Sequence, residues 1–239
     1  MPEPVATKLR HFLPLSAEDV GLLHAGLRRL ESYAAHTDVI QEGSEPRYLN
    51  VVLQGWICRY KQLEDGRRQI IAFFVPGDMC DPCVFLLDNM SHALATLTPA
   101  TIARVSEPEI LKLMQTSPGL TKAFWLEMLV SADIQREWTV SLGRRTAIER
   151  LAHLLCELLV RLRAVGLNEG PECELPLTQT DLGDALGLSS VHVNRTLQEL
   201  RGMRLIELKG RRLVVRNETA LQALALFNPD YLHFQRSVL

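Results

Sequence analysis

The spacing of apolar residues divides the chain into a helical start, a strand-rich region and a helical C-terminal half. Residues 7 to about 33 carry the amphipathic run LLHAGLRRL behind Ser16 and Asp19, a helix start signal, and therefore predict a helix. From 36 to 106, short apolar runs alternate with turn pairs such as Asp65-Gly66, which predicts a tight hairpin. This pattern of apolar runs and turns is typical of short antiparallel strands in a sandwich or barrel-like roll.

Helical spacing returns after Pro108 and continues toward the C-terminus. We expect a short helix at 109–114, a long one from Pro118 to about Leu142, and a third from Thr146 to Val165. Gly143-Arg144-Arg145 separates the last two and is the expected domain hinge.

The long helix is apolar over a broader arc than packing on one roll requires. Such a helix needs a second partner, and a twin helix from another subunit is the simplest one. A wholly intramolecular core helix is the alternative. The expected dimer interface consists of Phe124, Trp125, Met128, Ala132, Gln135, Trp138 and Leu142.

Residues 178–197, TQTDLGDALGLSSVHVNRTL, have the pattern of a helix-turn-helix. Thr178 and Asp181 form a capping box for the first helix, and Ser189 is a suitable N-cap for the second. Gly187 falls where the chain must turn, and Gly183 leaves room for the close approach of a second helix. An ordinary helical hairpin is the alternative interpretation.

Positive charge is concentrated next to this motif. Between 195 and 216 there are seven basic residues and two acidic ones, a local net charge of +5 in a chain of net charge −2. The stretch LIELKGRRLVVR also predicts a hairpin, which after a helix-turn-helix makes a winged helix. Phosphate neutralisation needs such a local concentration of charge. The expected DNA contacts are Thr178, Gln179, Ser189, Ser190, Val191, His192, Asn194, Arg195, Lys209, Arg211 and Arg212.

Composition limits the remaining classes of function. The five cysteines form an odd number spread over 239 residues, no apolar run reaches the length of a membrane span, and the N-terminus has no export signal. These features predict a cytoplasmic protein. No glycine-rich phosphate loop, nucleophile elbow or HExxH motif is present, so an enzyme is not expected.

The stretches EGSEPRYLNVVLQGWI, EDGRRQIIAFFVPGD and LTQTDLGDALGLSSVHVNRTLQELR resemble the cyclic-AMP receptor / fumarate-nitrate regulator (CRP/FNR) family over nearly the whole chain. The resemblance implies an α+β fold with a cyclic-nucleotide-binding-like β-roll sensory domain (1–117), a dimerisation helix (118–142) and a winged helix-turn-helix DNA-binding domain (143–239). It also implies a homodimeric transcription regulator that binds promoter DNA and acts on RNA polymerase. In this family pattern, Arg195 reads a guanine through O6 and N7.

The sequence departs from the cyclic-AMP-binding members of that family. Gly77-Asp78 stands where those members have a Gly-Glu pair for the ribose, and the following DNMSHALATL lacks the arginine that holds the cyclic phosphate. A buried phosphate without a cationic partner is poorly compensated, so cyclic-nucleotide binding is disfavoured. The expected effector pocket consists of Gly77, Asp78, Cys80, Cys83, Ser91 and His92.

Cofactors remain open. No cysteine precedes Cys58, which disfavours the N-terminal iron–sulfur cluster of the oxygen-sensing branch. Cys80 and Cys83 are either structural or serve a redox, metal or haem role. We therefore expect a dimeric regulator that binds a pseudo-palindromic promoter and responds to a signal at the roll. The alternative is a sensor or scaffold module that acts through a protein partner without DNA.

Overall fold

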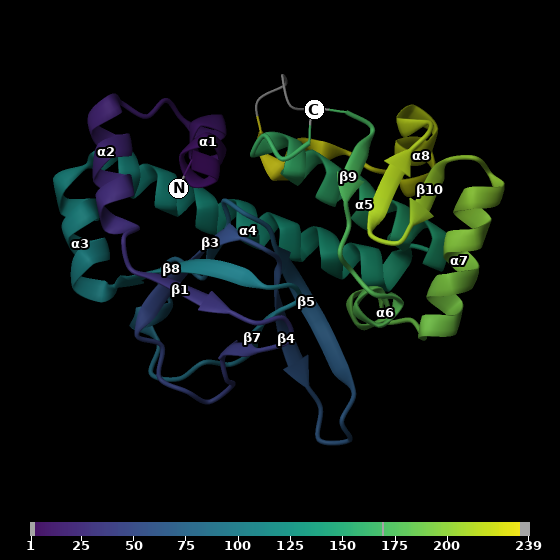
Figure 1. Cartoon of the computed structure of the whole chain (residues 1–239), viewed down its shortest axis with the longest axis horizontal. Coiled ribbons are helices and arrows are strands. Elements are labelled where there is room, and N and C mark those ends of the chain that lie inside the picture. Colours follow the sequence, from purple (N-terminus) through teal and green to yellow (C-terminus); the bar gives the residue numbers. More distant parts are fainter. Residues whose placement is uncertain (1–2, 169, 235–239) are drawn as a thin grey trace.

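The computed structural model describes residues 3–168 and 170–234 and has an α+β fold (Figure 1). Two four-stranded antiparallel sheets form the N-terminal β-roll, with strand orders β1-β8-β3-β6 and β2-β7-β4-β5. The strands are β1 (Leu30–Tyr33), β2 (Asp38–Ile40), β3 (Tyr48–Gln54), β4 (Ile57–Gln62), β5 (Arg68–Phe74), β6 (Met79–Cys80), β7 (Ala93–Thr96) and β8 (Ala100–Ser106).

Apolar side chains from both sheets fill the inside of the roll, among them Val52, Ile57, Phe74, Leu94 and Ile102. A second core lies between one face of the roll and four helices, α1 (Glu3–Phe12), α2 (Ala17–Gly26), α3 (Glu107–Thr116) and α4 (Pro118–Arg144). A single-turn helix, η1 (Val84–Leu86), follows β6. The expected hairpin is present as the β4–β5 pair, with Gly66 at φ +86 in its turn.

The expected single helix over 7–33 is wrong. The chain forms two helices, α1 and α2, and then pairs residues 30–33 with β8. Pro14 lies in the break, and Ser16 begins α2 with a capping box in which the Asp19 N–H donates to the Ser16 hydroxyl at 3.0 Å. Pairing with β8 along the sheet determines the strand, and this partner lies about seventy residues away in sequence.

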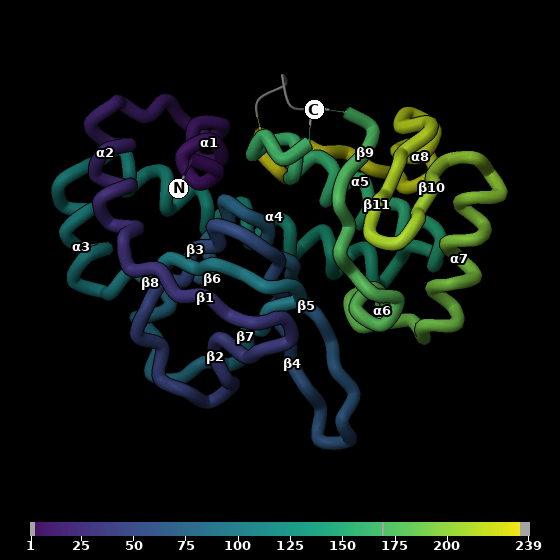
Figure 2. Tube along the Cα trace, viewed as in Figure 1, coloured from purple at the N-terminus to yellow at the C-terminus, as the bar shows by residue number. Residues whose placement is uncertain are grey.

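The long helix α4 passes behind both the roll and the C-terminal domain (Figures 1 and 2). It continues through Gly143, so the expected interruption at that glycine is wrong, and the chain turns at Arg145 and Thr146 instead. The C-terminal domain comprises α5 (Ala147–Ala164), β9 (Glu172–Glu174), α6 (Gln179–Leu186), α7 (Ser190–Gly202), β10 (Ile206–Lys209), β11 (Arg212–Val215), α8 (Glu218–Ala225) and η2 (Pro229–Leu232).

Helix α5 is the centre of this domain, because nearly its whole length is buried between α4, α7 and α8. The three-stranded sheet β10-β11-β9 packs beside it. Within residues 3–168 and 170–234, no helix is both long and apolar enough to cross a membrane.

Candidate DNA interface and effector pocket

Helices α6 and α7 form a helix-turn-helix whose turn is fixed by two glycines. Gly187 ends α6 in the left-handed region, at φ +64. A Cβ on Gly183 would lie 2.5 Å from the carbonyl oxygen of Leu188, and the Leu188 N–H donates to the Gly183 carbonyl at 3.0 Å. The predicted close approach at Gly183 therefore exists, but the backbone of the turn makes it rather than a helix.

Helix α7 has one buried and one open face. Val193, Leu197 and Leu200 are buried against the domain core. On the opposite face, Val191 is 79% exposed and the Arg195 side chain is 70% exposed. Ser189 caps the helix by accepting the His192 N–H at 3.2 Å. The open face therefore presents the first turns of the helix to solvent.

Arg195 is held only loosely by its neighbours. Its guanidinium lies 3.4 Å from His192 Nε2 and 3.9 Å from a Glu199 carboxylate oxygen, both at the outer limit of polar contact. Ser190 and Asn194 are exposed beside it, and His192 is half-buried. A loosely held guanidinium can leave these contacts for a base edge at little energetic cost.

The expected wing is the antiparallel pair β10–β11, with Gly210 at φ +59 in its turn. Lys209 and Arg211 are exposed at its tip, and Arg212 forms an ion pair with Glu172 of β9. Thr178 has a different role from the other predicted contacts. Its hydroxyl donates to Asp181 at 2.6 Å in the capping box and is used within the protein.

A pocket lies between the roll and α4, and its polar end is built around Asp81. His92 Nε2 lies 3.0 Å from one Asp81 oxygen, and Arg59 of β4 forms an ion pair with the other. Burial acts to raise the pKa of Asp81, but the hydrogen bond from His92 and the charge of Arg59 outweigh it and lower that pKa. The lining residues are Arg59, Asp81, Pro82, Cys83, Val84, Leu86, Leu87, His92, Met128, Ser131, Ala132 and Gln135.

The structure separates the six residues expected to form one effector pocket. Cys83 and His92 line the pocket, and Ser91 is exposed next to His92. Cys80 is buried in β6. Gly77 and Asp78 lie elsewhere, since a Cβ on Gly77 would contact Pro4 and Val165, and Asp78 pairs with Lys8 and Arg161. Their inclusion in the pocket is therefore wrong.

The expected effector pocket included neither Arg59 nor Asp81, although both line the observed pocket. A signal for Arg59 was present, because an arginine within the apolar run WICRY falls in a strand, and it is only 7% exposed in the roll. Asp81 gave no comparable signal. It adopts a left-handed backbone, at φ +55, and its carboxylate contacts Arg59 of β4 and His92, which immediately precedes β7.

Helix α4 also has an exposed apolar face. Trp125 is 55% exposed and Leu129 is 58% exposed, and Met128 and Leu142 are exposed as well. Phe124 and Trp138 do not belong to this face: Phe124 is buried beneath α1–α3, and Trp138 packs on Phe73 and donates to Glu157 at 2.9 Å.

Gln135 is half-buried and turned toward the roll, where its amide donates to the Ile71 carbonyl at 2.6 Å. The inclusion of Phe124 and Trp138 in a dimer interface is therefore wrong, because the chain's own core covers both. Ala132 remains at the edge of the exposed apolar face of α4.

Comparison with known proteins identifies the chain. Residues 30–117 match the cyclic nucleotide-binding domain and residues 149–224 match the Crp-like helix-turn-helix domain. The nitrogen fixation regulation protein FixK of Bradyrhizobium diazoefficiens is 30% identical over 181 residues, which cover 74% of this chain and 73% of that protein. The chain belongs to the CRP/FNR family of transcription regulators.

Two further relatives support the same family assignment. The transcriptional activator protein FnrL of Cereibacter sphaeroides is 29% identical over 192 residues, covering 79% of this chain and 77% of that protein. The structure of FixK2 from Bradyrhizobium japonicum superposes with a TM-score of 0.72 at 28% identity, covering 82% of this chain and 96% of that one. The protein is thus a DNA-binding transcription regulator with a cyclic-nucleotide-binding-like roll and a Crp-like helix-turn-helix.

Proposed function

We propose that this regulator is a homodimer that binds a pseudo-palindromic promoter site through two copies of α7. The exposed apolar face of α4 supports the dimer, because Trp125 and Leu129 lie one helical turn apart, both are exposed, and adjoining exposed apolar side chains commonly mark an interaction surface. A partner α4 packed against this face would cover both. In such a dimer, two recognition helices enter successive major grooves about 34 Å apart.

The proposal assigns base reading to Arg195 and backbone contacts to the wing. The observation that carries it is the open face of α7, with Arg195 exposed and loosely held near its N-terminal end. A free guanidinium makes the bidentate contact to guanine O6 and N7. Ser190, Val191 and Asn194 contact neighbouring bases, while Lys209 and Arg211 contact phosphates. Gln179, Ser189, His192 and Arg212 lie at the margin of this surface.

We further propose three functional units: a sensory roll (1–117), a dimerisation helix (118–142) and a DNA-binding domain (143–239). Promoter DNA and RNA polymerase are the proposed partners, and the function involves no catalytic step. The pocket at Asp81 is the proposed effector site. Met128 and Ala132 of α4 line it, so a ligand bound there contacts the helix that forms the proposed dimer interface.

The pocket chemistry does not fit a cyclic nucleotide. Arg59 is the cation that lines the pocket, and it is already paired with Asp81. A phosphate brought to this place would meet the Asp81 carboxylate and lose more by repulsion than it gains from a shared guanidinium. The apolar lining and the Asp81–His92 pair instead suit a small, largely apolar molecule with one hydrogen-bond donor.

Neither His92 nor the two nearby cysteines, Cys80 and Cys83, favours haem binding or thiol redox chemistry in this arrangement. His92 Nε2, one of the two ring nitrogens that could ligate a haem iron, is engaged by Asp81 at 3.0 Å. Burial raises the pKa of Cys80 and of Cys83, so both thiols favour the protonated form in this arrangement. Among the residues that the structure describes, no group of three His, Cys, Asp or Glu is arranged to hold a metal ion.

A salt titration of DNA binding tests this function. Binding of the protein to a duplex selected from a random library should weaken steeply as salt rises, with the logarithm of the affinity linear in the logarithm of salt. Arg195→Ala should lose affinity and relax discrimination at one base pair. A protein that binds no duplex, or binds with no salt dependence, would support a regulator acting through a protein partner instead.

A further inference from the structure

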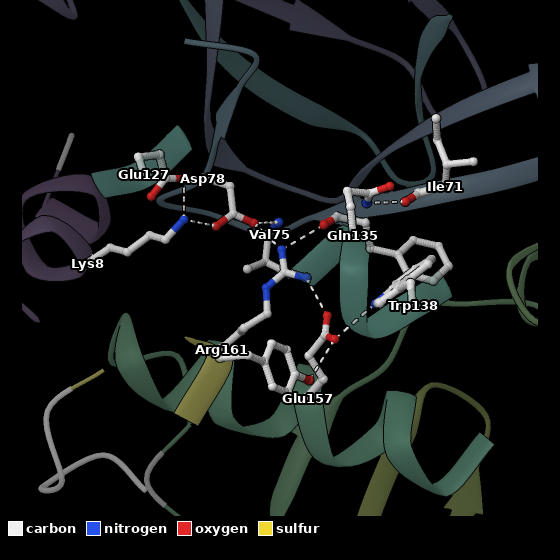
Figure 3. Close-up of polar contacts among 11 residues, drawn as sticks. Lys8, Ile71, Val75, Asp78, Glu127, Gln135, Trp138, Glu157 and Arg161 are labelled. Atoms are coloured by element: carbon white, nitrogen blue, oxygen red, sulfur yellow. Dashed lines mark hydrogen bonds and ion pairs between the residues drawn. The ribbon is translucent and has the colours of Figure 1, made fainter. Parts of the chain in front are cut away.

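A cluster of buried charges lies where the roll, α4 and the DNA-binding domain meet (Figure 3). We call it the Asp78 cluster; every one of its side chains is at most 8% exposed, and they come from α1, the turn before β6, α4 and α5. Its members are Lys8, Asp78, Glu127, Glu157 and Arg161.

Asp78 is the centre of the cluster. Its Oδ1 accepts from Lys8 Nζ at 2.7 Å, and its Oδ2 accepts from Arg161 Nη2 at 2.7 Å and from the Val75 N–H at 2.7 Å. Burial acts to raise the pKa of Asp78, but the charges of Lys8 and Arg161 outweigh it and lower that pKa. The roll therefore offers one ionised carboxylate, and two cations from other elements converge on it.

Arg161 links the roll to the DNA-binding domain. The same guanidinium donates to the Phe73 carbonyl at 2.7 Å and to Glu157 at 3.0 Å. Glu157 accepts in turn from Trp138 of α4 and from Tyr231 of η2, both at 2.9 Å. Side chains of α5 thus form hydrogen bonds with the roll, with α4 and with η2 at a single site.

Such a cluster favours one arrangement of the domains over all others. A buried ion without its partner is strongly destabilising, so the ion pairs of the cluster form only while the roll and α5 are docked in this geometry. Helix α5 packs directly on α7, so the position of Arg161 sets the direction of α7 relative to α4. In this arrangement the recognition face stays open, since Val191 is 79% exposed.

We propose that Arg161 and Asp78 are positioning residues for DNA recognition: their ion pair holds both recognition helices of a dimer at the separation and angle that two half-sites require. This inference rests on the proposed dimer. With the pair intact, binding of the first half-site presents the second recognition helix to its half-site at a high effective concentration. Without the pair, α7 can adopt other directions, and only a fraction of dimers can bind both half-sites.

The test compares two duplexes and two α5 arginines. The first duplex is the palindromic site that the wild-type protein selects from a random library, and the second has one half-site scrambled. Asp78→Asn combined with Arg161→Gln removes both charges of the pair, leaves Lys8 paired with Glu127, and leaves Glu157 with its hydrogen bonds from Trp138 and Tyr231. Arg163→Gln is the matched control, because Arg163 also lies on α5 but pairs within its own domain, with Glu218 at 2.6 Å.

The wild-type protein and Arg163→Gln should prefer the palindrome strongly. The double variant should lose about tenfold or more of that preference while its affinity for the single half-site stays within about twofold. Arg161→Lys keeps the charge but not the fork of donors, and should lose an intermediate part of the preference even if the double variant folds poorly.

Three results would overturn the inference: an unchanged preference, an equal loss of affinity on both duplexes, or tighter binding by the variants, which would make the cluster inhibitory. If the wild-type protein itself shows no preference for two half-sites, the proposed dimer is wrong, and the inference fails with it.

Discussion

The turn of the helix-turn-helix allows a substitution whose cost can be worked out from the structure. A methyl group on Gly183 would lie 2.5 Å from the Leu188 carbonyl oxygen, whereas carbon–oxygen contacts are ordinarily about 3.3 Å or longer. Gly183→Ala therefore requires the turn to move by roughly 0.8 Å. That movement also strains the bond from the Leu188 N–H to the Gly183 carbonyl, which is 3.0 Å long.

Overpacking of this kind costs about 1–3 kcal/mol, and the strained hydrogen bond adds about 1 kcal/mol. Alanine regains about 1 kcal/mol because it is the better helix former. The free energy of unfolding should therefore fall by about 1–3 kcal/mol. Affinity for DNA should fall as well, because the moved turn changes the angle between α6 and α7.

Gly21→Ala is the control, since Gly21 lies inside helix α2 and a Cβ there has nothing within 4 Å. It should raise the free energy of unfolding by about 0.5–1 kcal/mol and leave DNA binding unchanged. Urea unfolding of both variants, followed by far-ultraviolet circular dichroism, gives the comparison. A Gly183→Ala protein as stable as Gly21→Ala would refute the account of the turn.

Three further predictions concern the recognition face, the dimer and pH. Arg195→Ala should weaken binding to the selected site by about 1–3 kcal/mol, and unchanged affinity in a filter-binding assay would remove Arg195 from base recognition. Trp125→Ala with Leu129→Ser should shift the protein to monomer in sedimentation, and an unshifted dimer would exclude the exposed apolar face of α4 as its interface. Burial and then the charge of Arg145 lower the pKa of His153 from 6.5 to about 3, so His153 folds uncharged. The free energy of unfolding should therefore fall as pH drops below about 6.5, by up to about 1.4 kcal/mol per pH unit, and His153→Gln should lessen that slope in urea titrations.

Features that depend on neighbours in sequence were predictable. The capping box at Thr178 identified the start of α6 within one residue, because the bonds involved span three positions. The helix-turn-helix, its glycines and the basic wing follow from the same kind of local chemistry. The length of α4 was also evident from its unbroken helical spacing.

Features made by distant segments were not predictable from one sequence. Residues 30–33 form a strand because they pair with the edge of β8. The Asp81 site joins residues 11 and 22 positions apart, and direct contacts in the Asp78 cluster join residues up to 119 positions apart. The apolar arc of α4 was visible in sequence, but only the fold shows that the chain's own core covers Phe124 and Trp138. Periodicity indicates which residues are apolar and leaves open which surface covers each of them.

The stoichiometry of the DNA complex shows whether the protein reads two half-sites as a dimer. The full-length protein should be mixed with the selected palindromic duplex, and the mass of the complex measured by light scattering or native mass spectrometry. We expect two chains on one duplex, with the scrambled half-site duplex bound far more weakly. One chain per duplex, with equal affinity for both duplexes, would contradict a regulator that reads two half-sites as a dimer.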